Sequence, residues 1–269
     1  MTTLSLPDAP VDRWLEAARE RRSRRSFDGS KVSEEHLAAL HESCERLRPS
    51  PGARAALARS VSEELFRGIV GSYGRITGAS SALLFVGSAD SPQASTSAGY
   101  TGEALILEAT ALGLGTCWVG GMFDGSLARK MAGATGDEKV FSVSPLGLPM
   151  HKVTTTERFV YGMKKPKSRK SVEHIAPNLH DRDWPTWARP GAEAARIAPS
   201  AHNRQPWRFR ADGGAIVVSF DGPETPIVSK RLDCGIAMLH FELAVRAAGA
   251  SGSWELLEHR ADVARFTLG

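Results

Sequence analysis

Ala198-Pro199-Ser200-Ala201-His202-Asn203-Arg204-Gln205-Pro206-Trp207, in the last third of the chain, is the stretch that says most about its fold. Pro199 restricts the backbone, as proline does in turns. Ser200, Asn203 and Gln205 add short side chains that both donate and accept hydrogen bonds. Such groups in one turn suit the edge of a flat heteroaromatic ring. The stretch therefore predicts a turn that binds a planar ligand.

A basic cluster, Arg21-Arg22-Ser23-Arg24-Arg25, lies far away in the sequence. In an extended segment, Arg21, Ser23 and Arg25 share one side. Guanidinium groups offer paired charged donors to a phosphate, so the cluster could hold an anion. A solvated helix end, favoured by the helix dipole, would explain the same residues. A ligand with a planar head and an anionic tail would need both regions, so we expect the fold to bring them together.

Composition excludes several classes of protein. The chain has 269 residues, of which 42% are hydrophobic, enough for one large domain or two small ones. Its formal net charge of +4, from 34 basic and 30 acidic residues, is too balanced for a dedicated nucleic-acid binder. No apolar run of about 18 residues predicts a membrane span, and no secretory signal is apparent. We expect a cytoplasmic protein that binds neither nucleic acid nor membrane.

Cysteine and histidine patterns predict no metal site. Cys44, Cys117 and Cys234 are odd in number and lack CxxC spacing, which is typical of reduced thiols. The eight histidines show no ligand spacing. His202 and Ser200 lie too close in sequence to form a catalytic triad. No side-chain acid, base or nucleophile stands out, which favours chemistry carried by a cofactor.

Hydrophobic patterning predicts a mixture of helices and strands. We expect helices over residues 10–22, 33–47, 53–69, 102–112 and 236–248. We expect strands over 81–87 and 140–147 and a hairpin over 207–220, with loops over 88–98 and a connector over 184–191.

A weak internal repeat joins two parts of the chain. Gly113 and Gly249 each follow an apolar helix, and Trp118 and Trp254 stand at the same distance behind them. Both pairs are 136 residues apart (249 − 113; 254 − 118). Two matching residues could coincide by chance, but a helix, a glycine turn and a tryptophan in one order favour duplication.

Taken together, the motifs resemble the FMN-dependent nitroreductase-like family. Residues 21–27 look like its RxSxRxF signature, and Pro199–Trp207 looks like its more specific PSxxNxQPW signature. Gly113–Gly121 is similar to its GLGTCW-type turn, and Lys167–Glu173 resembles its late basic segment, for which an exposed charged loop is the alternative. The resemblance runs from about residue 14 to the C-terminus.

One departure from the family pattern concerns the order of the motifs. In typical members, PSxxNxQPW follows shortly after RxSxRxF, where this chain has Arg48-Pro49-Ser50-Pro51-Gly52-Ala53-Arg54. That stretch keeps Pro-Ser and lacks the rest. Typical members are dimers whose FMN sites use residues of both subunits. The chain thus resembles such a dimer fused into one polypeptide, as in the putative TM nitroreductase branch.

The resemblance implies an α+β, nitroreductase-like fold. Two related halves, residues 1–180 and 181–269, would form one compact intramolecular pseudo-dimer with central mixed or antiparallel sheets flanked by helices. Because both halves would contribute to one surviving composite site, we expect one FMN per chain and a monomer.

The resemblance also implies which residues bind FMN. Phosphate and neighbouring polar atoms would be held by Arg21, Arg22, Ser23, Arg25, Arg169 and Lys170. The ring or ribityl chain would contact Pro199, Ser200, Ala201, Asn203 and Gln205. Gly120 and Gly121 would let backbone amides approach the N5 side of the ring, because glycine has no side chain to keep it away. No protein residue would be catalytic, since the chemistry takes place at N5.

The implied activity is transfer of a hydride from NAD(P)H through FMN to a small electron acceptor such as a nitroaromatic or a quinone. Two alternatives stay open. One is a flavin-binding or sensor protein without turnover, and the other is a specialised flavin-fold enzyme that fragments flavin or removes halogen.

Overall fold

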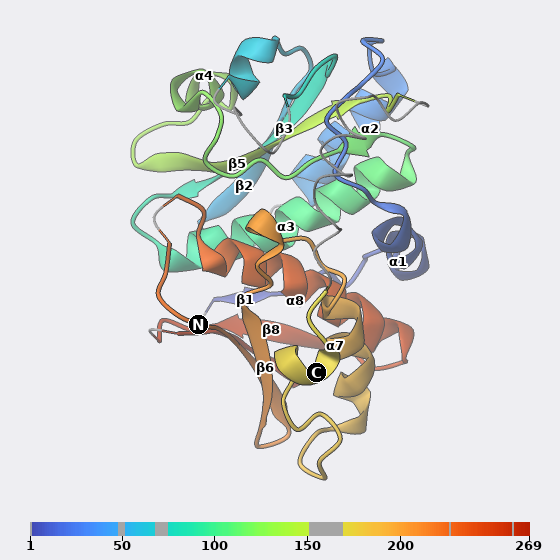
Figure 1. The fold of residues 1–269 in the computed structure, drawn as a ribbon, viewed down its shortest axis with the longest axis vertical. Coiled ribbons are helices and arrows are strands. Elements are labelled where there is room, and N and C mark those ends of the chain that lie inside the picture. The colour runs from blue at the N-terminus through green and yellow to red at the C-terminus, as the bar shows by residue number, and fades with distance from the viewer. Residues whose placement is uncertain (1, 48–51, 68–74, 151–168, 226, 260) are drawn as a thin grey trace.

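The computed structural model describes residues 2–47, 52–67, 75–150, 169–225, 227–259 and 261–269. In this part of the chain, helices α3 (Pro92–Ala111) and α8 (Lys230–Ala247) lie in the middle, between two β-sheets (Figure 1). One sheet has four strands in the order β2-β3-β5-β4, and the other has five in the order β1-β8-β9-β7-β6. Every pair of neighbouring strands is antiparallel. The architecture is α+β, as the sequence predicts.

The four-stranded sheet is built around β3 (Ser81–Ser88), a continuous apolar run that pairs with β2 (Ala53–Ala58) and β5 (Glu138–Gly147). The short β4 (Gly115–Thr116) pairs with the end of β5. Leu83 and Phe85 pack into the main core, whereas Leu84 and Val86 pack into a second cluster. That cluster includes residues of α4 (Gly125–Met131) and of the 3-10 helix η1 (Glu63–Phe66). The strand is apolar throughout because both of its faces are covered.

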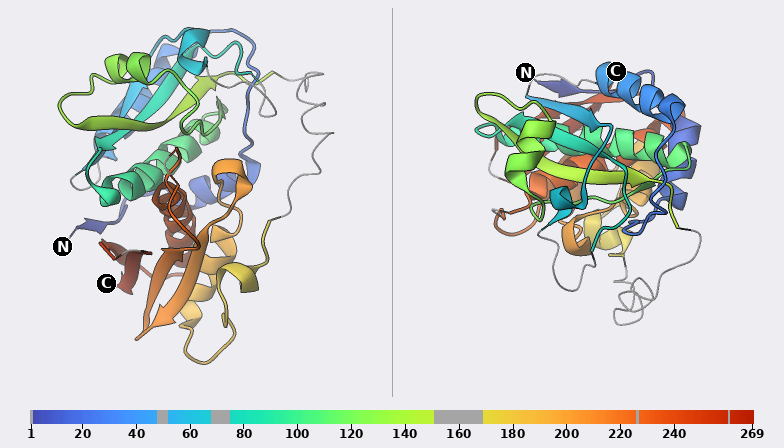
Figure 2. Two further views of the ribbon diagram at one scale, coloured as in Figure 1. Left: turned by 60° about the vertical axis from the view of Figure 1, so that its left-hand side comes forward. Right: turned by 90° about the horizontal axis from the view of Figure 1, so that it is seen from above.

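The five-stranded sheet contains the hairpin predicted near residue 213. β6 (Trp207–Asp212) and β7 (Ala215–Phe220) are joined through Gly213 and Gly214, both with positive φ. β9 (Asp262–Leu268) and β8 (Gly252–Leu256) follow. β1 (Thr3–Leu4) forms the far edge beside β8, so the two ends of the chain lie by the same sheet (Figure 2).

The two sheets repeat one topology. The order β2-β3-β5-β4 in the first corresponds to β6-β7-β9-β8 in the second. In each set, a long central helix connects the second strand in the chain to the third, α3 in one case and α8 in the other. The division at residues 180 and 181, and an origin by fusion, remain our proposal. β1 crosses that division to join the second sheet, so the second half takes one of its strands from the first.

Shorter helices cover the rest of the core. α1 (Val11–Glu20) packs against α3 and α8, and α7 (Arg189–Ala195) packs against α8. α2 (Glu34–Arg46) begins where predicted, because Ser33 Oγ accepts a hydrogen bond from the His36 N–H at 3.2 Å. Three short elements complete the set: α6 (Val172–Ile175), η2 (Thr186–Ala188) and η3 (Ala201–Asn203).

Three predictions about secondary structure are wrong. The predicted connector over residues 184–191 contains η2 and the start of α7, and its Trp184 and Ala188 side chains are buried in the core. Residues 53–58 form strand β2 rather than a helix, because pairing with β3 outweighs the helix propensity of their alanines. The helix expected from residue 102 begins at Pro92, inside the predicted loop. Ser91 caps it by accepting from the Ala94 N–H at 3.3 Å. Its first turns carry small residues that pack closely against α8, so they show no apolar stripe. No helix in the described part of the chain is long and apolar enough to cross a membrane.

Candidate functional site

The turn Pro199–Pro206 lies between α7 and β6 and has an unusual backbone. His202, Asn203 and Gln205 have φ values of 53°, 55° and 46°, in the left-handed region that L-residues seldom adopt. Each such residue costs on the order of 1 kcal/mol, and residues of this kind cluster at ligand-binding sites. The Ser200 hydroxyl oxygen helps to hold the turn by accepting from the Gln205 N–H at 2.9 Å.

Arg169 and Lys170 bond directly to this turn. The Lys170 N–H donates to Gln205 Oε1 at 2.8 Å, and Lys170 Nζ donates to the Gln205 carbonyl at 3.1 Å. Arg169 Nη1 donates to Asn203 Oδ1 at 3.1 Å and to the Ala198 carbonyl at 2.6 Å. The structure therefore brings the late basic segment and the Pro199–Pro206 turn together. Most of the basic run, residues 164–168, lies outside the described residues.

Positive charge gathers at this point. Burial, followed by repulsion from Arg21, lowers the pKa of Arg169 to about 10, and Glu103 opposes the shift. Arg21 Nη1 is buried and has no hydrogen-bond partner among the described residues. Lys170 Nζ, by contrast, lies 3.7 Å from the carboxylate of Asp221. Buried donors are normally paired, so the unpaired nitrogen of Arg21 is a candidate donor to an anion beside Arg169.

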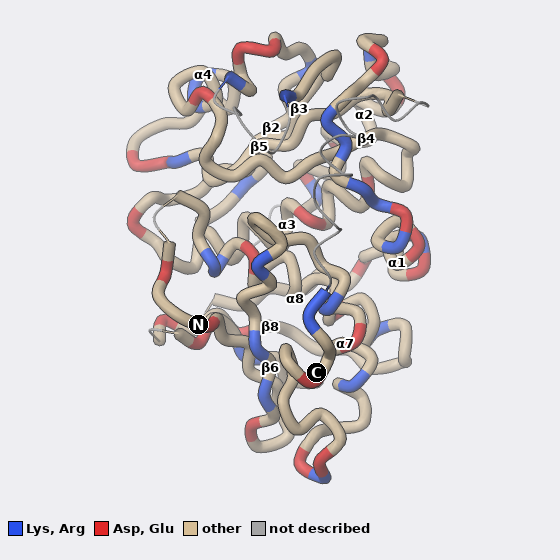
Figure 3. Tube along the Cα trace, in the orientation of Figure 1, with Lys and Arg blue, Asp and Glu red and all other residues tan. Residues whose placement is uncertain are grey.

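The Arg21–Phe27 segment runs out from the C-terminal end of α1 as a basic stretch, visible in Figure 3. From Ser23 onward it is extended: the Arg24 N–H donates to the Thr116 carbonyl at 2.8 Å, and Ser23 forms a β-bridge with Thr116. Its Phe27 ring packs where side chains on Gly115 or Gly147 would collide with it. This pairing fixes the arginines next to β4.

Arg22 has a local role. Its Nη1 donates to the carbonyls of Arg19, Glu20 and Arg21 at 2.8, 3.2 and 2.9 Å. These carbonyls lie at the end of α1, so Arg22 matches the helix-end interpretation. Any contact of Arg22 with a cofactor stays a proposal.

Gly120 and Gly121 contact the loop that leads into α8. A Cβ on Gly120 would lie 2.9 Å from both methyl groups of Val228. Gly121 has a φ of +83°, and its Cβ would lie 2.3 Å from Ile227 Cγ2. The close packing of the protein itself therefore explains why both positions are glycine. A bound ring is not needed to explain it, and contact of their amides with a ring stays a proposal.

Arg204 connects the turn to that loop. Its Nε donates to Asp233 Oδ2 at 2.6 Å, its Nη1 to Thr225 Oγ1 at 2.7 Å and its Nη2 to the Val228 carbonyl at 2.7 Å. Asp233 Oδ1 also accepts from the Ala201 N–H at 3.0 Å. Burial raises the pKa of Asp233 to about 6, and the charge of Arg204 opposes the shift.

Neither Arg204 nor Asp233 was predicted as a site residue. Two features of the sequence could have indicated them: Arg204 lies in the middle of the PSxxNxQPW signature, and Asp233 is an acidic residue in the first turn of the buried helix α8. A second polar group between the central helices was also missed. Glu103 shares a 2.9 Å hydrogen bond with His240 and accepts one from Trp118 Nε1 at 2.7 Å.

The four segments indicated by the sequence form one connected region. The turn contacts residues 169–170 directly, and Arg21 acts on Arg169 through its charge. The turn reaches Gly120 and Gly121 through Arg204 and the loop before α8. Among the described residues, no group of three His, Cys, Asp or Glu side chains could hold a metal ion.

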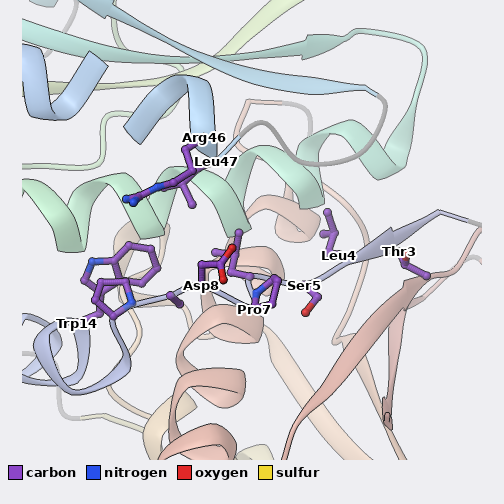
Figure 4. Close-up of a pocket in the computed structure, with 11 residues that line it drawn as sticks. Thr3, Leu4, Ser5, Pro7, Asp8, Trp14, Arg46 and Leu47 are labelled. Atoms are coloured by element: carbon purple, nitrogen blue, oxygen red, sulfur yellow. The ribbon is translucent and has the colours of Figure 1, made fainter. Parts of the chain in front are cut away.

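A cavity of about 270 Å³ lies elsewhere, between the N-terminal segment Thr3–Pro10, Trp14 of α1 and the end of α2 at Arg46 and Leu47 (Figure 4). None of the predicted site residues lines it.

The model of the family described as Putative TM nitroreductase matches residues 14–245. The chain belongs to this family. Its fold is the nitroreductase-like α+β fold, and the family is one of oxidoreductases.

A solved structure of high coverage has the same fold. This nitroreductase-family chain is similar to a putative nitroreductase from Thermotoga maritima, with 21% identity over 95% of this chain and 93% of that chain and a TM-score of 0.62. A nitroreductase with bound FMN from Bacteroides fragilis matches at 20% identity over 52% of this chain and 90% of that chain, with a TM-score of 0.42. Among curated proteins there is no significant match.

Proposed function

We propose that the chain is an FMN-dependent oxidoreductase that passes a hydride from NAD(P)H to a small electron acceptor such as a nitroaromatic or a quinone. One observation carries the proposal. Arg169, a partly buried cation, bonds to a left-handed turn of short polar residues and feels the charge of Arg21, of which one buried guanidinium nitrogen has no partner among the described residues. An anionic tail and a planar head on one ligand would match both features.

FMN fits this donor set. Its phosphate would neutralise Arg21 and Arg169, with Ser23, Arg25 and Lys170 nearby in the two basic segments. Its ring and ribityl chain would lie along the Pro199–Gln205 turn, whose side chains offer both donors and acceptors. The amides of Gly120 and Gly121 would face the same ligand from the first sheet.

When bound, FMN would supply the hydride chemistry at N5. The chain's own residues would bind and orient it. Arg21 and Arg169 would anchor the anionic end. The bonds among Lys170, Gln205 and Asn203 hold the turn rigid, so that its polar atoms need no rearrangement on binding. Because these groups come from both proposed halves, one chain suffices for the site, and we propose a monomer in the cytoplasm.

An absorption spectrum tests the proposal. We expect purified protein, after incubation with FMN, to show flavin bands that NAD(P)H bleaches under anaerobic conditions and that a quinone restores. Arg25→Ala and Asn203→Ala should lower the bound flavin at least tenfold, whereas Arg67→Ala, which removes an exposed arginine elsewhere, should leave it unchanged.

The outcomes distinguish the alternatives. If the purified protein is colourless and does not bind added FMN, the proposal is overturned. Flavin that stays oxidised with NADH and NADPH would indicate a binding or sensor protein. Reduction by NAD(P)H without transfer to any small acceptor would favour a specialised flavin-fold enzyme.

A further inference from the structure

Ile227 combines two properties that seldom occur together. Its side chain is 68% exposed, the most exposed of the large hydrophobic side chains recorded among the described residues. Yet its Cγ2 contacts Gly121 so closely that any larger residue there would collide with it. A branched aliphatic side chain is thus held over Gly121 with most of its surface facing outward.

Hydrogen bonds hold Thr225 and Val228, the described residues on the two sides of Ile227. Arg204 donates to the Thr225 hydroxyl and to the Val228 carbonyl, both at 2.7 Å, on either side of Ile227. The Thr225 hydroxyl itself donates to the Val228 carbonyl at 2.6 Å. Arg204 Nε lies 2.6 Å from Asp233 Oδ2, so the carboxylate of Asp233 holds the guanidinium group in place. Because Thr225 and Val228 are held by these hydrogen bonds, Ile227 is kept in its exposed position.

Met122 adds a second exposed apolar side chain at the same place. It directly follows Gly121 and is 38% exposed. Single exposed hydrophobic residues are common on protein surfaces. Both of these loop side chains adjoin Gly121, Met122 as its neighbour in the chain and Ile227 by contact, and Arg204 bonds to Val228 beside them.

Resting on the proposed function, we propose that Ile227 and Met122 form the surface that contacts the electron acceptor, and that Arg204 is the positioning residue that holds Ile227 there. A flat apolar acceptor, such as a quinone, would cover both side chains and remove their surface from water. A compact, multiply charged acceptor would gain nothing from them. The patch thus makes the site selective for flat apolar acceptors.

Binding to the oxidised protein tests this without turnover. In the absence of NAD(P)H, we expect menadione to bind Ile227→Ala and Met122→Ala about five- to tenfold more weakly than wild type, measured by calorimetry. This is the effect of losing one or two buried methylene equivalents. Leu268→Ala, which truncates an exposed aliphatic side chain at the end of β9, should leave binding unchanged.

Steady-state kinetics give the second readout. The ratio of kcat/KM for menadione to that for ferricyanide should fall about tenfold in Ile227→Ala, mainly through KM for menadione. Arg204→Lys keeps the positive charge, but lysine cannot bond to Asp233, Thr225 and Val228 together. This variant should therefore also lower the ratio of kcat/KM for menadione to that for ferricyanide. If Arg204 acts through Ile227, the double variant Arg204→Lys/Ile227→Ala should be no less selective than Ile227→Ala alone.

Flavin content separates the two possible failures. If wild type binds no FMN, the proposed function fails and this inference fails with it. If all variants keep their flavin but menadione binding and the acceptor ratio do not change in Ile227→Ala and Met122→Ala, the inference alone is overturned. Additive losses in the double variant would remove the positioning role of Arg204.

Discussion

Gly99 of α3 and Gly235 of α8 lie at the crossing of the two central helices, and each admits the backbone of the other helix. A Cβ on Gly99 would lie 2.1 Å from the Leu232 carbonyl oxygen, and one on Gly235 would lie 2.0 Å from that of Thr96. Both pairs are 136 residues apart (235 − 99; 232 − 96), the spacing already found for Gly113 and Gly249. The closest contact of the central helices is therefore symmetric, which supports the proposed duplication.

Replacing either glycine by alanine should force α3 and α8 apart. We expect Gly99→Ala and Gly235→Ala each to lower the free energy of unfolding by about 3 kcal/mol, the upper end for overpacking. The two losses should be similar because the contacts are equivalent. Gly125→Ala at the start of α4, where a Cβ meets nothing within 4 Å, should be neutral or slightly stabilising. Urea denaturation measures all three, and wild-type stability in Gly99→Ala would contradict the close crossing.

The cationic pair Arg21 and Arg169 should discriminate FMN from riboflavin, which lacks the phosphate. Hydrogen bonds to charged groups contribute about 1.5–3 kcal/mol each, so we expect FMN to bind at least about a hundredfold more tightly. Arg21→Ala should narrow that ratio by about tenfold with little effect on riboflavin, whereas Arg169→Ala should narrow it and also weaken riboflavin binding, because Arg169 bonds to Asn203 of the turn. Titration of flavin fluorescence measures both affinities, with Arg67→Ala as control. Equal affinities in wild type would rule out a phosphate site here.

Glu242 should make stability depend on pH. Its carboxylate accepts from Tyr100 Oη at 2.6 Å and from the Leu6 N–H at 3.3 Å. Burial raises its pKa from 4.5 to about 7, with these hydrogen bonds opposing the shift. The folded protein therefore prefers the protonated form. The stability contributed by this group is complete below pH 4.5 and is lost as the pH rises to about 7.

The expected size of that loss is on the order of 3 kcal/mol. Glu242→Gln cannot ionise, so its free energy of unfolding should fall less than that of wild type between about pH 4.5 and pH 8. Denaturant unfolding at several pH values compares the two proteins. Glu42→Gln, an exposed position on α2, should retain the wild-type dependence. Identical profiles for Glu242→Gln and wild type would contradict the prediction.

The Arg54–Glu138 pair should act in the opposite direction. Arg54 of β2 donates through Nε and Nη2 to the two carboxylate oxygens of Glu138 at 2.7 and 2.9 Å. The hydrogen bond from Arg54 is the main cause that lowers the pKa of Glu138 to about 2. Stability from this pair is present above pH 4.5 and is lost as the pH falls towards 2.

Arg54→Ala should therefore lower the free energy of unfolding by about 1–2 kcal/mol at neutral pH, since both side chains are partly exposed and solvent weakens the pair. The deficit should shrink below about pH 3. Arg59→Ala, which removes a more exposed pair with Glu34, should cost less than about 0.5 kcal/mol. A deficit that is constant with pH would show that Arg54 stabilises the fold through packing or through its hydrogen bonds to the Ala132 and Gly133 carbonyls, and not through Glu138.

Local patterns predicted much of the architecture. The apolar run of β3 and the two glycines between β6 and β7 determine their conformations through neighbouring residues, and Ser33 marks the start of α2. Where partners are distant, the prediction was wrong. Residues 53–58 read as helix because nothing nearby in sequence reveals that β3 has a free edge.

By itself, the sequence determined the family, the signature turn and the two basic segments, because each is a short motif whose residue types carry their own chemistry. Tertiary structure alone decided how they connect. Arg169 donates a hydrogen bond to Asn203, and Arg204 donates one to Val228. Ile227 contacts Gly121, which lies more than a hundred residues before it in the chain. The close crossing of α3 and α8 likewise requires glycine at Gly99 and Gly235, two positions that look ordinary in the sequence because the backbone they contact is distant in the chain.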